Sequence, residues 1–251
     1  MEKQPLLNTY INNVTMEEAI DRIEDMISSK KRSYVVAINV DVVMKIEKDP
    51  YLKEIVDNAD MVLVDGTPLI WIAKSHKRPV KEKVSGSDLV PRLCKTASEK
   101  GYTVFILGGK DGIAEQAKQK LEKNYPGIKI VGTYAPPLGF EKDDSALKKI
   151  NAFISEAHPD LLIVCLGCPK QEKFIYENIS KYNACTSICA GATVDFLAGN
   201  VKRAPKWMSD HGLEWFYRFT QEPARLFKRY FIDDMKIFRL ARKYAKKQIS
   251  E

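Results

Sequence analysis

The sequence lacks any apolar stretch long enough to cross a membrane. The longest uninterrupted run, residues 161–166, is far shorter than the roughly 18–20 residues that a spanning helix needs. The N-terminal residues also lack the apolar core of a secretory signal peptide. Only 5 cysteines occur, scattered and odd in number, which argues against a disulfide framework and favours a reducing compartment. These absences predict a cytoplasmic protein that does not cross a membrane.

The signatures of common cofactors are missing as well. There is no G-x-x-x-x-G-K-[ST] motif, and the turn after the first predicted strand of the sheet lacks G-x-G-x-x-G. The 3 histidines are isolated, and no predicted strand ends in an Asp-x-Asp that could hold a divalent ion. Cys165 and Cys168 have redox spacing, but Cys165 falls inside an apolar strand, which favours a buried thiol. We therefore expect neither cofactor nor metal, so an anionic substrate would have to be neutralised by Arg and Lys.

The positive charge is confined to one end of the chain. The 251 residues carry a formal net charge of +7, yet residues 202–251 hold 13 Lys and Arg against 6 Asp and Glu, which leaves 27 of each sign before them. A hydrophobic fraction of 45% with only 13 Gly and 12 Pro excludes a disordered or collagen-like chain. The sequence therefore indicates a folded, electrically neutral body of residues 1–199 followed by a basic region, residues 200–251.

Short apolar runs alternate with segments of helical period before residue 199. The runs are continuous rather than alternating, as expected for strands buried on both faces of a parallel sheet. Predicted strands are residues 34–40, 61–64, 103–107, 128–132, 160–166 and 186–189. Predicted helices are residues 15–28, opened by a Thr15/Glu18 capping box, and residues 87–100, 111–124, 145–157 and 171–179. This order predicts an α/β fold with an open, doubly wound, mostly parallel, Rossmann-like sheet.

The basic region has no strand signal. Residues 204–247 are predicted to form two or three helices with a break at Glu222-Pro223. The last of these helices combines an apolar stripe with many basic positions, so we expect a basic amphipathic appendage. A solvated basic face is the alternative explanation of such a helix.

Ligands of open α/β sheets bind at the carboxyl ends of the strands, so the residues that follow each predicted strand are the site candidates. Glycines after three strands would allow a ligand to approach the backbone, although packing alone also explains such turns. Asp65 ends a buried strand, where burial would raise its pKa toward that of a general base; a helix N-cap is the alternative role. Asp41 could likewise cap a helix, and Glu172 could serve the helix dipole, whereas Asn39 is harder to explain as a cap.

Taken together, these strand ends and the segments after them resemble the WecG/TagA/CpsF glycosyltransferases, in the same order from about residue 35 to residue 230. The matching motifs are Asn39-Val-Asp41, Asp65-Gly-Thr-Pro68, Ser85-Gly-Ser-Asp88, Leu107-Gly-Gly109, Gly167-Cys-Pro-Lys-Gln-Glu172, Gly191-Ala-Thr-Val-Asp195, Ala198-Gly199, Arg203-Ala-Pro205 and Gly212-Leu-Glu-Trp215, followed by Arg218, Glu222-Pro223 and Arg225. The resemblance implies transfer of a sugar from a UDP-sugar to a polyprenyl-diphosphate-linked saccharide at the inner face of the cell membrane, without metal. Its TagA branch, which is most similar, implies inverting transfer of N-acetylmannosamine (ManNAc) to undecaprenyl-diphosphate-linked N-acetylglucosamine (GlcNAc) for wall teichoic acid.

The resemblance assigns roles as hypotheses. Asp65 would be the base, Asn39 and Gln171 would position sugar or phosphate, and residues 191–195 would hold uridine. Arg218, Arg225 and Arg229 would neutralise the leaving UDP in place of a metal. Further substrate-binding candidates are Asp41, Gly66, Thr67, Ser87, Asp88, Gly108, Gly109, Gly167, Lys170, Gly191, Ala192, Asp195 and Arg203.

The appendage has a second expected use, because basic residues dock proteins on anionic membranes. Its apolar stripe could also drive self-association into a homo-oligomer. Two other protein classes remain open. A nucleic-acid-binding protein is disfavoured by the neutral body and by a tail without a DNA or RNA motif, and an epimerase or dehydrogenase is disfavoured by the missing nicotinamide fingerprint. Within the family, a mannosaminuronic acid or glucosyl transferase is a further alternative.

Overall fold

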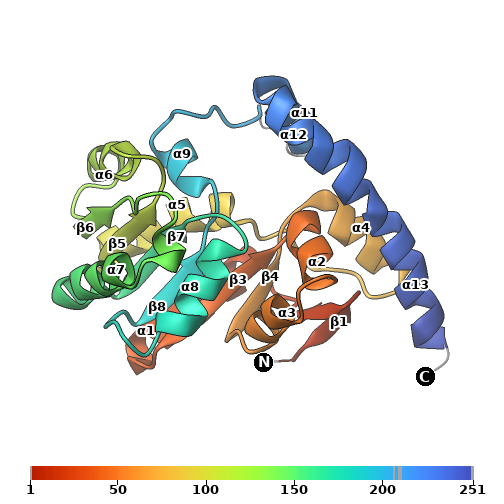
Figure 1. Cartoon of the computed structure of the whole chain (residues 1–251), viewed down its shortest axis with the longest axis horizontal. Coiled ribbons are helices and arrows are strands. Elements are labelled where there is room, and N and C mark those ends of the chain that lie inside the picture. Colours follow the sequence, from red (N-terminus) through yellow and green to blue (C-terminus); the bar gives the residue numbers. More distant parts are fainter. Residues whose placement is uncertain (1, 206, 209–210, 250–251) are drawn as a thin grey trace.

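The computed structural model describes residues 2–205, 207–208 and 211–249, and its centre is a six-stranded parallel sheet (Figure 1). The strand order is β4-β3-β8-β7-β5-β6. The strands are β3 (Ser33–Ile38), β4 (Met61–Val64), β5 (Thr103–Gly108), β6 (Lys129–Tyr134), β7 (Leu161–Cys165) and β8 (Thr186–Cys189). All six predicted strands are confirmed, and the expected open α/β sheet with them.

Helices cover both faces of this sheet. On one face the buried core includes residues of α2 (Val40–Ile46), α3 (Pro50–Asp57), α4 (Thr67–Ser75), α7 (Asp144–Ala157) and α8 (Lys170–Asn178). On the other face the core includes residues of α1 (Met16–Ser29), α5 (Gly86–Lys100), α6 (Ile113–Asn124) and α9 (Thr193–Leu197). A 3-10 turn (Phe140–Lys142) precedes α7. Two apolar layers therefore hold the strands rigidly and fix the positions of their carboxyl ends.

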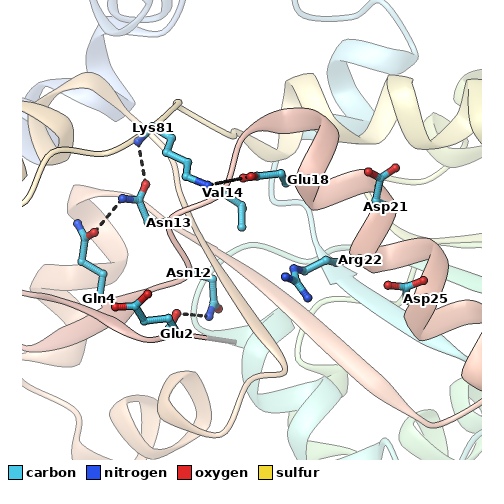
Figure 2. A pocket seen from close by; sticks show the side chains of 10 residues that line it. All are labelled: Glu2, Gln4, Asn12, Asn13, Val14, Glu18, Asp21, Arg22, Asp25 and Lys81. Atoms are coloured by element: carbon cyan, nitrogen blue, oxygen red, sulfur yellow. Dashed lines mark hydrogen bonds and ion pairs between the residues drawn. The ribbon is translucent and has the colours of Figure 1, made fainter.

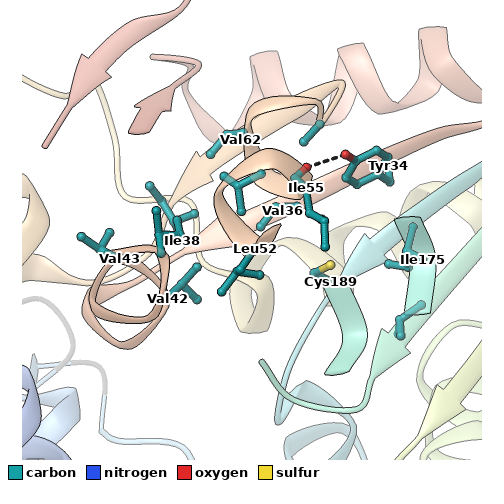
Figure 3. Packing of buried hydrophobic residues seen from close by; sticks show 14 of the residues in the cluster. Tyr34, Val36, Ile38, Val42, Val43, Leu52, Ile55, Val62, Ile175 and Cys189 are labelled. Atoms are coloured by element: carbon teal, nitrogen blue, oxygen red, sulfur yellow. Dashed lines mark hydrogen bonds between the residues drawn. The ribbon is translucent and has the colours of Figure 1, made fainter. Parts of the chain in front are cut away.

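Local sequence explains where these elements begin. The predicted capping box of α1 is present, because the Thr15 side chain accepts from Glu18 N and the Glu18 side chain accepts from Thr15 N. In the face that carries α2 and α3, Ile38, Val42 and Leu52 pack into one apolar layer (Figure 3). The Tyr34 hydroxyl reaches across the same layer and donates to the Ile55 carbonyl at 2.5 Å. The dense packing of this layer fixes the entry of α2, which follows β3 at the edge where ligands bind in such sheets.

An antiparallel hairpin of β1 (Gln4–Leu6) and β2 (Thr9–Ile11) lies beside β4. Asn12 joins the two: its backbone N donates to the Val62 carbonyl and its Oδ1 accepts from Val62 N, both at 2.8 Å. These bonds satisfy backbone groups of the sheet's edge strand, which would otherwise be open to pairing with another chain. This hairpin was not predicted, because three-residue strands give too short a pattern in the sequence.

The C-terminal helices pack along one side of the α/β body, near α2 and α4 (Figure 1). The predicted break at Glu222-Pro223 is confirmed: α11 (Glu214–Gln221) ends there and α12 (Pro223–Lys228) begins. A π-helix (Arg229–Asp233) and a 3-10 turn (Asp234–Lys236) lead into α13 (Ile237–Ile249). None of the helices in the described part of the chain is long and apolar enough to span a membrane.

Buried side chains and ion pairs hold α13 in place. Ile237 and Leu240 are buried in the core on the α2 face. Farther along, Lys243 Nζ lies 2.7 Å from Glu47 Oε1, and the Tyr244 hydroxyl donates to Glu47 Oε2 at 3.3 Å. The appendage is therefore packed on the body rather than extended away from it.

Candidate active site

The carboxyl ends of the strands form the floor of a crevice, and the C-terminal helices form its roof. Two cavities make up this crevice, with volumes of about 410 Å³ and 140 Å³. They share Asn39, Asp65, Ser87, Arg218 and Arg229. The first three come from the ends of β3 and β4 and from α5, while the arginines come from α11 and the π-helix. The folding of the α/β body thus brings together side chains that are more than 180 residues apart in the sequence.

Asp65 lies at the centre of the crevice and does not cap a helix. It follows β4, and the N-cap of α4 is Gly66, whose backbone φ of +100° is one that side-chain-bearing residues rarely adopt. The Asp65 carboxylate makes no hydrogen bond to any residue that the structure describes. The capping role is therefore excluded, and the carboxylate is free to face a ligand.

The surroundings of Asp65 suit a general base. Burial raises the pKa of its carboxyl from 3.8 to about 6, and the charges of Glu214 and Asp88 act in the same direction. Lys83 and Arg218 oppose this rise. A carboxylate with this pKa is ionised at neutral pH yet retains more affinity for a proton than an exposed aspartate.

Asn39 and Asp41 lie at the start of α2, and both line the crevice. Asn39 is the N-cap of α2, because its Oδ1 accepts from Val42 N at 3.2 Å, so the expectation that it is not a cap was wrong. Its Nδ2 makes no hydrogen bond to any described residue and can donate into the crevice. Asp41 lies in the first turn of α2 and pairs instead with Lys45 at 2.8 Å.

The buried Gln171 side chain links Glu172 to the turn after β8 through two hydrogen bonds. Its side chain is only 5% exposed; Oε1 accepts from Gly191 N at 2.9 Å and Nε2 donates to Glu172 Oε1 at 2.8 Å. Glu172 is fully buried, and this burial raises the pKa of its carboxyl. Glu172 therefore does more than favour the helix dipole, since it orients the amide that fixes the turn after β8.

Two of the three candidate arginines reach the crevice. The Arg218 guanidinium lies 5.3 Å from the ring centre of Phe196. Arg229 lies 3.9 Å from Asp41 and 3.6 Å from Asp234, and its buried Nε has no hydrogen-bond partner among the described residues. Arg225 is on α12, but its side chain lies outside the described part of the structure. A partly exposed guanidinium that is incompletely hydrogen-bonded is suited to bind an anion.

Most of the other predicted substrate-binding residues line the crevice. These are Asp41, Gly66, Thr67, Ser87, Gly167, Gly191 and Ala192. Asp88 and Arg203 form an ion pair in a second groove, which adjoins the crevice and shares Thr67, Lys83 and Gly212 with it. The structure therefore brings together residues from five separate motifs of the sequence.

Four predicted residues are not among those that line the crevice: Gly108, Gly109, Lys170 and Asp195. A Cβ on Gly108 would lie 2.3 Å from the Cys165 carbonyl oxygen, so this glycine permits close approach of β5 to β7. Lys170 pairs with Glu141 at 2.7 Å, and the Asp195 carbonyl accepts from Asn200 N at 3.0 Å. Close packing accounts for Gly108 and an ion pair for Lys170, while the ligand contacts expected of the four residues stay predictions.

Lys83 and Glu214 were missed as site residues, although both line the crevice. Lys83 Nζ lies 3.4 Å from Glu214 Oε2 and 3.7 Å from Asp88 Oδ2. The only signal in the sequence is that Lys83 precedes one family motif by two residues and Glu214 lies within another. Their charges tune Asp65, which could not be foreseen without the fold.

A separate polar cavity of about 460 Å³ lies beside the N-terminal hairpin and shares no lining residue with the crevice (Figure 2). Asn13 Nδ2 donates to Gln4 Oε1 at 2.8 Å, and Asn13 Oδ1 accepts from Lys81 N at 2.8 Å. Lys81 Nζ pairs with Glu18 at 2.8 Å. These hydrogen bonds and the ion pair connect the hairpin to α1 through the lining of the cavity.

Cysteine and metal chemistry receive no support from the described residues. The two cysteines of the redox spacing are both free thiols, and Cys165 is buried in β7, which confirms the predicted core thiol. Burial raises the pKa of the Cys165 thiol to about 12. Among the described residues there is no group of three or more His, Cys, Asp or Glu side chains that could hold a metal ion.

A parallel α/β sheet with an acid, amides and arginines at its carboxyl edge is an arrangement that can bind a phosphorylated or nucleotide-linked substrate. Sequence comparison gives the family: the profile of the glycosyl transferase WecG/TagA/CpsF family matches residues 4–251. The chain belongs to this family and is a glycosyltransferase, as the motifs implied.

Two curated relatives from Bacillus carry one name, N-acetylglucosaminyldiphosphoundecaprenol N-acetyl-beta-D-mannosaminyltransferase. The protein of Bacillus subtilis strain 168 is 30% identical over 226 residues, which cover 90% of this chain and 86% of the relative. The protein of Bacillus spizizenii is 29% identical over 199 residues, which cover 79% of this chain and 75% of the relative. The chain is thus similar to these enzymes over most of their length.

Proposed function

We propose that the protein transfers ManNAc from UDP-ManNAc to undecaprenyl-diphosphate-linked GlcNAc, with inversion and without a metal. The observation that carries this proposal is the Asp65 carboxylate, which caps no helix and lies at the centre of a crevice with two arginines in its roof. The names of the relatives support the choice of donor sugar and acceptor. The match to the family over nearly the whole chain supports the class of reaction.

In the proposed reaction Asp65 accepts the proton of the acceptor hydroxyl. The hydroxyl oxygen attacks the anomeric carbon of the donor from the face opposite the nucleotide, and the bond between this carbon and the diphosphate oxygen breaks. UDP leaves with the bonding electron pair. A single displacement of this kind inverts the anomeric configuration.

The nucleotide is proposed to lie on the side of the crevice that carries Gly167 and Gly191. Both glycines follow buried strands, and both have positive φ, +74° and +57°. A Cβ at either position would meet no atom within 4 Å, so the backbone there leaves open space for a ligand. The Gln171 side chain already holds Gly191 N, which fixes this turn before the donor binds.

Arg218 and Arg229 are proposed to stabilise the leaving diphosphate, and single changes to Gln test this role. Each charge-assisted hydrogen bond is worth roughly 1.5–3 kcal/mol, so each variant is expected to lower kcat/KM by about 10- to 150-fold. The measurement is UDP release with a short-chain, water-soluble acceptor. Arg239→Gln removes the same charge from an exposed position on α13 and serves as the matched control. Equal rates for Arg218→Gln, Arg229→Gln and the control would contradict the role.

The appendage is also proposed to dock the enzyme on the inner face of the cell membrane. Its exposed apolar side chains lie on consecutive helices: Trp215, Phe216, Phe227, Phe231, Ile232, Met235 and Phe238. Basic residues of the same helices would add roughly 1 kcal/mol each near an anionic surface. Self-association through this apolar surface is the alternative, and vesicle binding separates the two.

Donor and acceptor profiling tests the proposed reaction. Purified enzyme is incubated with a panel of UDP-sugars and lipid-linked acceptors in the presence of EDTA, and released UDP is measured. UDP release is expected when UDP-ManNAc and lipid-linked GlcNAc are supplied together. Preference for a mannosaminuronic acid or glucosyl donor would replace the donor assignment, and loss of activity in EDTA would refute metal independence.

A further inference from the structure

A large groove adjoins the crevice and is separate from the proposed nucleotide side. Its volume is about 1050 Å³, at the upper end of the range typical of small-molecule sites. It lies between α4, the beginning of α5 and the segment around Ala204 and Gly212. It shares Thr67, Lys83 and Gly212 with the smaller cavity of the crevice, so the two adjoin.

The lining of this groove combines a broad aromatic surface with charges of both signs. Trp71 on α4 is 57% exposed, and Ile70 and Pro91 add apolar surface. The charged side chains of the lining are Glu82, Lys83, Asp88, Arg92 and Arg203. Such a surface offers both donors and acceptors to hydroxyl groups and a flat apolar face to a ring. The mixed charge does not suit a polyanion such as a nucleic acid.

The charged wall of the groove is ordered before any ligand binds. Arg203 pairs with Asp88, and Lys83 bridges Asp88 at 3.7 Å and Glu214 at 3.4 Å. Of these residues, Lys83, Glu214 and Asp88 also influence the pKa of Asp65. The groove therefore leads to the proposed base through a preformed polar wall.

Asp65 lies between two sides of the site from which a substrate could reach it. Gly167 and Gly191 line the larger cavity of the crevice but neither the smaller cavity nor the groove. Asp65 lines both cavities of the crevice and lies between the glycine turns and the end of the groove. An inverting displacement requires the attacking hydroxyl and the leaving nucleotide to lie on opposite faces of the donor sugar. If the nucleotide occupies the glycine side, the acceptor has to approach from the side of the groove.

We propose that the groove between α4 and α5 binds the amino-sugar head of the lipid-linked acceptor, with the face of Trp71 against the sugar ring. This assignment rests on the proposed transfer reaction and adds a site for its second substrate. Trp71 acts here as a binding residue for the acceptor and not as a membrane anchor. A change at Trp71 therefore weakens acceptor binding even when no membrane is present.

Replacement of Trp71 by Ala and by Phe tests the groove. The probe is GlcNAc diphosphate on a short, water-soluble alkyl chain, so that membrane docking contributes nothing. Its Kd is measured by calorimetry without donor, and the Kd of UDP-ManNAc is measured separately. Loss of the aromatic face is expected to raise the acceptor Kd about tenfold in Trp71→Ala. Trp71→Phe should restore most of the binding, and the donor Kd should not change in either variant.

Leu138→Ala is the matched control, because Leu138 is fully exposed on a loop outside the groove. Thermal melting checks that each variant folds. An acceptor Kd that is unchanged in Trp71→Ala overturns the groove assignment, as does an equal rise in the donor Kd. Turnover by the wild type separates the two proposals. Binding that depends on Trp71 without any sugar transfer would refute the reaction and keep the groove, whereas transfer with Trp71-independent binding would refute the groove alone.

Discussion

Replacing Asp65 by Asn is expected to lower kcat by about 10²–10⁴-fold, the usual effect of losing a general base. The Asn side chain keeps the shape of Asp but cannot accept the proton of the acceptor hydroxyl. The fold should be unaffected, because the carboxylate caps no helix and bonds to no described residue. The measurement is UDP release under saturating donor and acceptor.

The pH dependence of the wild type follows from the same residue. Asp65 acts as a base only when ionised, and the pKa of its carboxyl is about 6. The rate should therefore be constant well above pH 6 and fall about tenfold per pH unit below it. In Asp65→Asn the residual rate should lose this dependence.

The ionised Asp65 carboxylate is also expected to lower the free energy of unfolding at neutral pH. Its pKa is raised in the folded protein, so the folded state binds more protons than the unfolded state between about pH 4 and pH 6, and stability falls as the pH rises through this window. Asp65→Asn should accordingly have an equal or higher Tm at pH 7. Asp111→Asn, at an exposed carboxylate after β5, is the control and should change neither rate nor Tm. Near-full turnover in Asp65→Asn would refute the base assignment.

A chain that ends at Gly199 is expected to lose sugar transfer completely and to lose binding to anionic vesicles. The truncation removes Arg218 and Arg229 from the roof of the crevice, and it removes the exposed apolar and basic side chains of α11–α13. The parallel sheet should remain, because all six strands lie before the cut. Activity is read by UDP release, vesicle binding by co-sedimentation and the fold by circular dichroism.

The truncation also uncovers the core surface under Ile237 and Leu240, so a milder variant is needed beside it. Met235→Ser with Phe238→Ser changes two exposed residues that do not line the crevice. This double variant should bind vesicles less well and yet transfer sugar to a water-soluble acceptor at the wild-type rate. Unchanged co-sedimentation of both variants would show that the appendage does not dock the enzyme on membranes.

The sequence predicted the sheet well because buried parallel strands leave an uninterrupted apolar run. The strands at residues 61–64 and 186–189 are confirmed to the residue. Shorter elements such as α2 and the N-terminal hairpin were missed, since seven or three residues are too few for a reliable period. The break at Glu222-Pro223 was predictable because the effect of proline on a helix is local and does not depend on tertiary contacts.

The candidate site was predictable only in part. The strand-end rule placed Asp65, Asn39 and Gln171 at one edge, and the structure brings these residues together there. It could not distinguish a cap from a free side chain, which is why Asn39 was not recognised as the N-cap of α2 and capping was left open for Asp41. Lys83 and Glu214 act on Asp65 through space, and no local pattern reveals such a contact.

The anomeric configuration of the transferred sugar is the measurement that tests the proposed chemistry most directly. The enzyme is incubated with UDP-ManNAc and a short-chain acceptor in EDTA, and the new linkage is assigned by NMR. A single displacement with Asp65 as the base predicts a product formed without metal, in which the configuration of the donor is inverted. A product with retained configuration, or no product until a divalent metal is added, would contradict this mechanism.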